Sequence, residues 1–137
     1  MIIFDTDVLS ALMATRQPPP TTLTDRIAET DPDDHATTTI TLGEIAYGAF
    51  RVDRPELYER ARELITAGGM TVLAFDQPAA EHYGAIRTAL EREGRRLADP
   101  DLRIAALARS CGALLVTRNI RHFARVPDLR SANWIDA

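Results

Sequence analysis

Short apolar runs alternate along the chain with longer stretches in which apolar residues recur every three or four positions. At the start, Ile2, Ile3 and Phe4 form a run typical of a buried strand, and the residues after Asp7 continue with apolar positions at helical spacing. Later runs with strand character lie at 36–42, 70–75, 113–117 and, more briefly, at 132–136. The clearest helices are expected over 53–69, 76–94 and 99–112.

This alternation of strands and helices decides the expected fold class. Strands separated by helices of about 10–15 residues indicate βαβ crossovers, so we expect an α/β protein with a mainly parallel central sheet. Three prolines at 18–20 interrupt one helical stretch, but neither a repeat nor a linker divides the chain. We therefore expect one domain spanning residues 1–137.

Polar side chains follow several of the predicted strands, at the edge where ligands of a parallel sheet bind. Four segments supply them: Asp5 with Asp7, Glu44, Asp99 with Asp101, and Thr117 with Arg118 and Asn119. Asp5 and Asp7 follow the first strand, Glu44 is expected in the first turn of a helix, and Asn119 follows the strand at 113–117. We expect these four segments to lie close together at this edge of the sheet.

Each of these residues also has an ordinary structural explanation. Asp7 is placed to cap the helix that follows it, which is the role we favour for it. Asp99 precedes a proline, as an N-cap commonly does, so we interpret Asp99 as structural and Asp101 as free to face a site. Glu44 in a first helical turn complements the helix dipole, and Asn119 alone would be a turn residue.

Charge is distributed unevenly along the chain. Residues 1–83 carry a net charge of −8 and residues 84–137 carry +4, and all sixteen basic residues are arginine. A total of −4 disfavours binding of nucleic acid through net charge alone. The arginines of the C-terminal third, Arg118 and Arg121 among them, are suited to contact phosphate groups.

Several classes of protein are excluded by what the sequence lacks. Without lysine there is no Walker A loop, receiver-domain site or Schiff-base enzyme, and GxGxxG, GxSxG and HExxH are also missing. Cys111 is the only cysteine, so neither a disulfide framework nor a thiolate metal cluster is expected. No apolar run approaches the ~18–20 residues of a membrane span, and the start does not resemble a signal peptide, so we expect a cytoplasmic protein with no membrane partner.

The acidic residues therefore point to a site for a hard cation. Asp5, Glu44 and Asp101 offer oxygen ligands, which suit Mg²⁺ or Mn²⁺ better than Zn²⁺. Such ions generate a hydroxide nucleophile and stabilise a leaving oxygen, which is the usual chemistry of phosphodiester hydrolysis.

Three stretches of the chain resemble, in order, the signatures of the PIN-domain ribonucleases, specifically VapC-type toxins of bacterial toxin–antitoxin modules. They are "IIFDTDVLSAL", "TTITLGEIAYGAFR" and "LADPDLRIAALARSCGALLVTRNIRHFARVPDLRSANW". The resemblance implies a three-layer α/β/α sandwich around a parallel sheet and a Mg²⁺-dependent endoribonuclease, with Mn²⁺ as a substitute, that cleaves a transfer, ribosomal or messenger RNA.

The same resemblance implies roles for individual residues. The family's acidic positions fall on Asp5, Glu44 and Asp101 as metal ligands, and its fourth catalytic position falls on Asn119, which carries no charge. Thr117 matches a family hydroxyl, and whether Asp99 also contacts the metal stays open. Thr117, Arg118 and Arg121 are the expected contacts to RNA.

Partners are also implied by the resemblance. It predicts a homodimer and a cognate VapB-type antitoxin that blocks the site, in a heterotetramer or larger assembly. The segments 8–14 and 44–50 are candidates for the dimer or antitoxin contact, with ordinary core packing as the alternative.

Two other functions remain open at this stage. "IIFDTDVL" also resembles the start of haloacid-dehalogenase-type phosphatases, in which the first Asp, here Asp5, is the covalent nucleophile, although that class normally needs a lysine that this chain lacks. The second alternative is a non-catalytic binding module whose acids serve only as helix caps.

Overall fold

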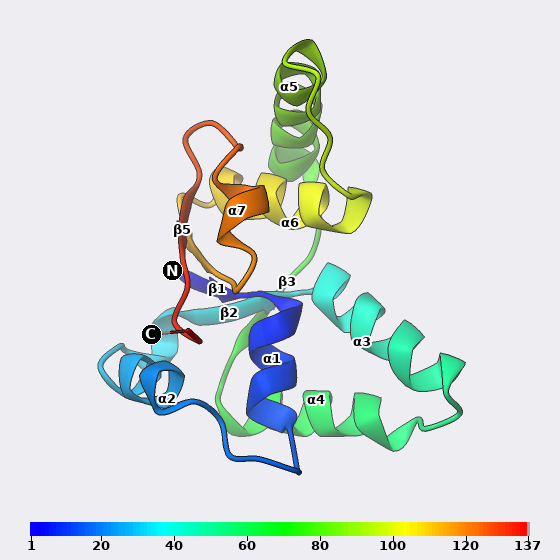
Figure 1. Cartoon of the computed structure of the whole chain (residues 1–137), viewed down its shortest axis with the longest axis vertical. Helices are drawn as coiled ribbons and strands as arrows, with labels where there is room; N and C mark the ends of the chain where they lie inside the picture. The colour runs from blue at the N-terminus through cyan, green and yellow to red at the C-terminus, as the bar shows by residue number, and fades with distance from the viewer. Residues whose placement is uncertain (137) are drawn as a thin grey trace.

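The computed structural model describes residues 1–136 and contains a five-stranded sheet with helices on both faces (Figure 1). The strands are β1 (Ile2–Phe4), β2 (His35–Thr38), β3 (Thr71–Leu73), β4 (Leu114–Val116) and β5 (Arg130–Ala132). The helices are α1 (Thr6–Met13), α2 (Thr21–Ala28), α3 (Thr39–Arg51), α4 (Glu56–Ala67), α5 (Gln77–Arg92), α6 (Asp99–Ser110) and α7 (Ile120–Phe123). A 3₁₀ turn, η1 (Pro32–Asp34), precedes β2.

All strand pairs of this sheet are parallel, in the order β3-β2-β1-β4-β5. The expectation of a parallel α/β sheet is therefore confirmed. The first strand lies at the centre, and the chain builds outward from it on one side through β2 and β3 before it returns on the other through β4 and β5.

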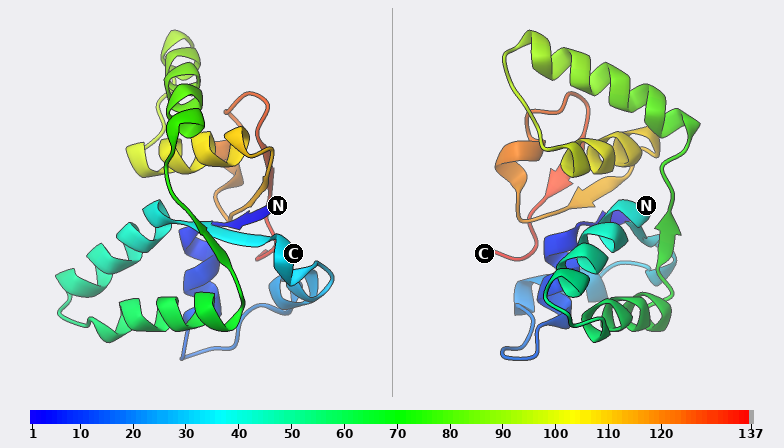
Figure 2. Two further views of the ribbon diagram at one scale, coloured as in Figure 1. Left: turned by 180° about the vertical axis from the view of Figure 1, so that it is seen from behind. Right: turned by 90° about the vertical axis from the view of Figure 1, so that its right-hand side faces the viewer.

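Two hydrophobic cores cover the two faces of the sheet, which makes the three-layer sandwich that the resemblance implied. Ile3 and Leu115 belong to the core under α5, α6 and α7, whereas Phe4 and Val116 belong to the core under α1, α2 and α4. Consecutive residues of a strand point to opposite faces, so each central strand contributes to both cores. Figure 2 shows the two helical layers on either side of the sheet.

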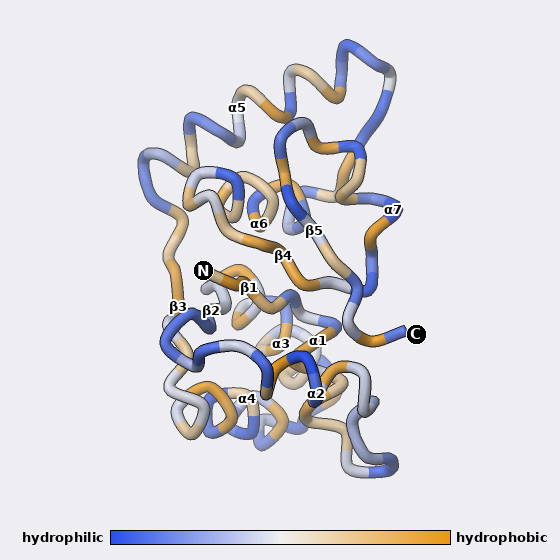
Figure 3. Tube along the Cα trace, turned by 90° about the vertical axis from the view of Figure 1, so that its left-hand side faces the viewer, coloured by the Kyte–Doolittle hydropathy of each residue, from blue (hydrophilic) through white to orange (hydrophobic). Residues whose placement is uncertain are grey.

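Burial on both faces explains why the central strands are continuous apolar runs. In Figure 3, β1 and β4 are hydrophobic along most of their length, whereas the outer helices alternate between hydrophobic and hydrophilic residues. Parallel strands that helices cover on both sides have this composition, whereas a half-exposed strand would alternate.

The sequence pattern placed several element boundaries wrongly. The predicted strand at 36–42 ends at Thr38, whose hydroxyl accepts a hydrogen bond from the backbone N–H of Thr41 and caps α3. Glu44 is consequently in the second turn of α3, not the first. Helix α4 begins at Glu56 with Pro55 at its N-cap, and the last strand lies at Arg130–Ala132 instead of 132–136.

The order of the strands determines where a ligand site can form. The helix that follows β1 packs on one face, whereas the helix that precedes β4 packs on the other, so the two connections diverge between these neighbouring strands. A crevice beyond the carboxyl ends of the strands is expected at such a switch point. Asp5 and Thr117, the residues that follow β1 and β4, meet there because Phe4 pairs with Val116.

No helix within residues 1–136 is long and apolar enough to cross a membrane.

Candidate active site

Asp5 is the most buried acid of the crevice, with 5% of its surface exposed. Its side chain caps α1 by accepting a hydrogen bond from the backbone N–H of Thr6 at 2.7 Å, and it accepts a second from the hydroxyl of Thr117 at 2.8 Å. Burial nevertheless raises the pKa of Asp5 to about 6, and the nearby carboxylates of Asp7 and Asp101 add to the increase. Two donors are therefore not enough to balance the cost of burying this charge.

Asp7 has a different role from the one predicted. The helix cap is Asp5, two residues earlier, so the interpretation of Asp7 as the cap is wrong. Asp7 instead reaches across to the loop after β4, where its Oδ2 accepts a hydrogen bond from the backbone N–H of Arg118 at 2.9 Å and lies 3.4 Å from the hydroxyl of Thr117. Its other oxygen, Oδ1, is buried without a hydrogen-bond partner, and burial raises the pKa of this carboxyl.

Glu44 is oriented toward the same crevice from α3. Its Oε1 accepts a hydrogen bond of 2.8 Å from the hydroxyl of Thr6, which also lies 3.2 Å from the hydroxyl of Thr41. Thr6 thus contacts both acids, since its backbone N–H donates to Asp5 and its hydroxyl donates to Glu44.

Asp101 enters the crevice from the first turn of α6 and is half-buried. Burial is the main reason that its pKa is raised, and the charges of Glu44 and Asp7 raise it further, while nearby His122 lowers it. Asp101 is therefore close enough to two of the other acids for their charges to raise its pKa.

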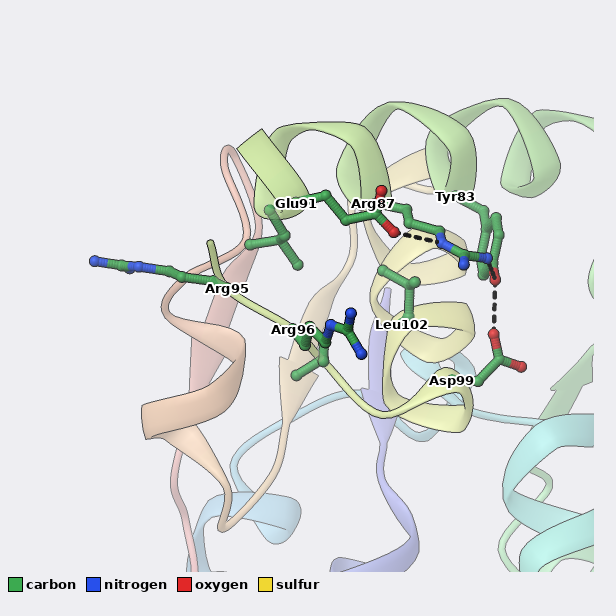
Figure 4. A pocket seen from close by; sticks show the side chains of 9 residues that line it. Tyr83, Arg87, Glu91, Arg95, Arg96, Asp99 and Leu102 are labelled. Carbon is green, nitrogen blue, oxygen red and sulfur yellow. Dashed lines mark hydrogen bonds and ion pairs between the residues drawn. The ribbon is translucent and has the colours of Figure 1, made fainter. Parts of the chain in front are cut away.

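Asp99 lies on the outer side of the same helix start. The N-cap of α6 is Ala98, so the interpretation of Asp99 as the cap is wrong. One carboxylate oxygen of Asp99 lies 2.6 Å from the hydroxyl of Tyr83 (Figure 4). The other lies 2.7 Å from Nε of Arg103, and both groups lower the pKa of Asp99. Asp99 thus ties α6 to α5 at the surface.

The loop after β4 completes the crevice. The buried hydroxyl of Thr117 accepts a hydrogen bond from the backbone N–H of Asn119 at 3.0 Å while it donates to Asp5. The side-chain amide of Asn119 lies 2.8 Å from Nδ1 of His122, which holds that amide at the start of α7.

The two arginines of this loop are exposed. Nε of Arg118 lies 3.6 Å from a carboxylate oxygen of Asp136, whereas Arg121 lines a separate hollow with Arg125. Neither arginine forms an ion pair with an acid of the crevice in the part of the chain that the structure describes.

Three contributors to the crevice were not predicted from the sequence. Asp7 was assigned to a cap, and Thr6 and His122 were given no role in the site. The spacing of Asp5 and Asp7 was the available signal, because two acids directly after a central strand both lie at the carboxyl edge.

The donor set of the crevice suits a hard divalent cation. It consists of four acids: Asp5, Asp7, Glu44 and Asp101. None of them takes part in an ion pair within residues 1–136, three have raised pKa values, and one buried oxygen lacks a partner. Uncompensated carboxylate oxygens of this kind are the ligands that Mg²⁺ and Mn²⁺ prefer.

These side chains do not yet form a closed cage. No three His, Cys, Asp or Glu side chains of the described residues are grouped closely enough to enclose a metal ion as they stand. The chemistry of these side chains fits the ion, whereas their carboxylates lie too far apart in this arrangement to enclose it.

The chain is similar to known proteins in both sequence and structure. A family model described as PIN domain matches residues 2–129. Ribonuclease VapC1 of Haemophilus influenzae (strain R2866) is 33% identical over 133 residues, which is 96% of this chain and 96% of that protein. The tRNA(fMet)-specific endonuclease VapC of Shigella flexneri is 41% identical over 99 residues, which is 69% of this chain and 71% of that protein. In the solved structure of VapBC-1 from nontypeable Haemophilus influenzae, a chain 33% identical in sequence superposes with a TM-score of 0.85 and covers 99% of this chain and 100% of its own.

Proposed function

The chain belongs to the PIN-domain family and, within it, to the VapC-type ribonucleases, and from this premise we propose that it is the toxin of a toxin–antitoxin pair, a metal-dependent endoribonuclease. The observation that carries the proposal is a set of four acids at the switch point of the sheet, none of which has an ion-pair partner within residues 1–136. The phosphatase alternative gives way to the family match, which spans residues 2–129.

Asp5, Glu44 and Asp101 would hold Mg²⁺ or Mn²⁺, with Asp7 beside them. When bound, the ion lowers the pKa of a coordinated water and stabilises the charge that develops on the phosphate and the leaving oxygen. The residues around it prepare that chemistry. Thr117 and the backbone of Thr6 fix both oxygens of Asp5, and the hydroxyl of Thr6 orients Glu44.

Asn119 supplies no charge to the site and has a positioning role. Its amide lies at the mouth of the crevice, where His122 holds it, so it is placed to donate a hydrogen bond to a phosphate oxygen. Arg118 is exposed on the same loop and is available to contact the RNA backbone. No side chain needs to act as a covalent nucleophile in this scheme.

Initiator transfer RNA is the first candidate substrate to test. The relative from Shigella flexneri is named as a tRNA(fMet)-specific endonuclease, and it is 41% identical over 99 residues. Ribosomal and messenger RNA are the other candidates. Acting on such an RNA, the protein would stop translation and growth in the cytoplasm until an antitoxin neutralises it.

An antitoxin of the VapB type is the proposed inhibitor. A groove between α1, α3 and α4 opens beside Glu44 and is lined by apolar side chains such as Met13 and Leu57. A peptide lying in this groove would reach the acidic crevice with a side chain of its own, which supports an arginine of the antitoxin as the blocking group.

The outer surface of α3 is the proposed interface of a homodimer. Tyr47 and Phe50 are 67% and 57% exposed, and Val52 after the helix is 52% exposed. Large apolar side chains that cluster at a surface mark an interface more often than a solvated face. This surface belongs to the segment 44–50 that the sequence singled out.

The test is RNA cleavage by protein freed of any antitoxin. Cleavage of initiator transfer RNA is expected with Mg²⁺ or Mn²⁺, and none with a chelator. The Asp101→Asn variant should be inactive and folded, with Asp99→Asn as the matched control on the same helix turn. Absence of cleavage of transfer, ribosomal and messenger RNA by the metal-loaded protein would favour the binding-module alternative.

A further inference from the structure

A second cluster of charge lies beside the acidic crevice, and its sign is opposite. Four arginines from two segments line one open hollow, which we call the arginine hollow. Its lining residues are Gly94, Arg95, Arg96, Arg121, Ala124 and Arg125. The first three belong to the loop between α5 and α6, and the others belong to α7 and the residues after it.

Most of the positive charge in this hollow is unpaired. Arg95 lies 3.8 Å from Glu93, but Arg96, Arg121 and Arg125 have no carboxylate within ion-pair distance in residues 1–136. No acidic side chain lines the hollow. Like charges gathered in this way repel one another, so an anion that enters is attracted by all four.

A neighbouring hollow between α5 and α6 provides the contrast. There, Arg87 lies 3.0 Å from Glu91 and donates a hydrogen bond to Tyr83, whose hydroxyl is bound to Asp99 (Figure 4). With Arg103, which lies 2.7 Å from Asp99, this network pairs each carboxylate with an arginine and links the two helices. Arg95 and Arg96 border both hollows.

The loop that carries two of the arginines is fixed in shape. Gly94 ends α5 with φ of +69°, which an L side chain rarely adopts, and the backbone N–H groups of Gly94 and Arg95 donate back to Glu91 and Leu90. The guanidinium of Arg125 donates to the carbonyl of Arg96 at 3.4 Å and joins the two walls of the hollow. The arginines are thus held near one another before any ligand binds.

Helix α7 connects the arginine hollow to the acidic crevice. His122 lies on the crevice side of this helix, where its ring nitrogen Nδ1 is 2.8 Å from the side-chain amide of Asn119. The preceding residue, Arg121, faces the hollow, and Arg125 lies one turn farther along. An RNA strand with one phosphate at the carboxylates would pass over this short helix before reaching the hollow.

We propose that the arginine hollow binds the sugar–phosphate backbone of the RNA at a phosphate away from the bond that is cut. This proposal rests on the proposed function and adds a substrate-positioning site to it. Guanidinium groups bind phosphate oxygens in pairs, which suits a backbone contact. No aromatic side chain lines the hollow for a base to stack on, so the contact positions the RNA without reading its sequence.

The experiment compares two glutamine pairs that remove the same charge, one in the hollow and one elsewhere, with a lysine pair that keeps the charge of the hollow. One variant carries Arg121→Gln and Arg125→Gln, and a second carries Arg121→Lys and Arg125→Lys. The control carries Arg26→Gln and Arg62→Gln, which are exposed on α2 and α4 in the opposite half of the molecule (Figure 1). Affinity for an RNA oligonucleotide is measured over a range of salt concentrations in an Asp101→Asn background, and cleavage is measured in the active protein.

The glutamine pair in the hollow should weaken RNA binding by roughly 10-fold or more at moderate salt and lower the salt slope of log K by about 1–2, as for two lost phosphate contacts. KM should rise while kcat stays within about twofold. The lysine pair should recover most of the affinity, and the control pair should match the parent protein.

Equal affinity and salt slope in the hollow and control variants would overturn the proposal. Unchanged RNA binding together with weaker binding of the antitoxin would also overturn it, in favour of an acidic protein segment as the occupant. A parent protein that cleaves no RNA would contradict the proposed function, whereas binding by the inactive background would still decide the role of the hollow.

Discussion

The hydroxyl of Thr117 donates a hydrogen bond of 2.8 Å to Oδ2 of Asp5, across 112 residues of sequence. Both groups follow central strands that lie side by side, and both are buried. This contact joins the beginning of the chain to its last third at the point where the acids gather.

Replacing Thr117 by valine should weaken metal binding. Asp5 would lose one of its two donors, and its pKa would rise further above about 6, so protons would compete better with the ion. We expect the half-saturating Mg²⁺ concentration for cleavage to rise about 10–100-fold, as for other groups that orient a ligand. Thr117→Ser keeps the hydroxyl and is the control. Equal Mg²⁺ dependence in both variants would show that the contact does not matter.

Stability in a chelator should depend on pH through Asp5. Its folded pKa of about 6 exceeds the ordinary 3.8, so between these values the folded protein binds the proton more tightly than the unfolded chain does. The contribution of this group to stability is therefore present below about pH 4 and is lost as pH rises to about 6, at a cost of the order of 3 kcal/mol at pH 7.

The Asp5→Asn variant removes that cost and should be more stable than the parent at pH 7, and we expect it to be inactive toward RNA. Denaturant unfolding at pH 5 and pH 7 in a chelator measures the difference, which should be larger at pH 7. A variant that is less stable than the parent at both values would show that the hydrogen bonds of Asp5 outweigh its burial.

Asp7→Asn should affect the metal more than the fold. An asparagine oxygen can still accept the hydrogen bond from the N–H of Arg118, but one negative charge of the site is removed. We expect the Mg²⁺ requirement to rise about 10–100-fold with little change in melting temperature. Wild-type metal dependence in this variant would reduce Asp7 to a structural contact of the loop.

Asp99→Asn tests whether the two acids at the start of α6, Asp99 and Asp101, have different roles. Asp99 is exposed and its partners are Tyr83 and Arg103, and exposed pairs of this kind contribute little to stability. Cleavage should be retained, with a melting temperature within a few degrees of the parent. An inactive Asp99→Asn protein with an intact fold would place Asp99 in the metal site.

Replacing Tyr47 and Phe50 by serine should alter assembly and leave the monomer folded, because both side chains are exposed on α3. Sedimentation of the antitoxin-free protein is expected to shift from dimer to monomer. If the parent protein is itself a monomer at all concentrations, this surface does not serve a homodimer.

Much of the fold could be predicted because the central strands are apolar on both faces and the helices between them are strongly marked. The boundary between β2 and α3 was missed because a run of threonines and isoleucine has high strand propensity, while the hydroxyl of Thr38 is equally able to cap a helix. Local preference could not decide between these two outcomes.

The candidate site was predicted as a gathering of acids, but the roles of individual acids depended on contacts that sequence spacing does not contain. Asp5 and Asp7 are both chemically able to cap α1, and only the position of the loop after β4 determines which one does. Asp99 was mistaken for a cap because one of its two partners, Tyr83, lies on another helix.

The central position of β1 also affects the protein while it is being made. Its neighbour β4 ends at Val116. The acids of the crevice come from distant parts of the chain, with Asp5 near its start, Glu44 in α3 and Asp101 in α6. A nascent chain on the ribosome cannot assemble the crevice until β4 and the loop after it have emerged. The cell that synthesises this nuclease is thus exposed to its activity only after nearly the whole domain has been translated.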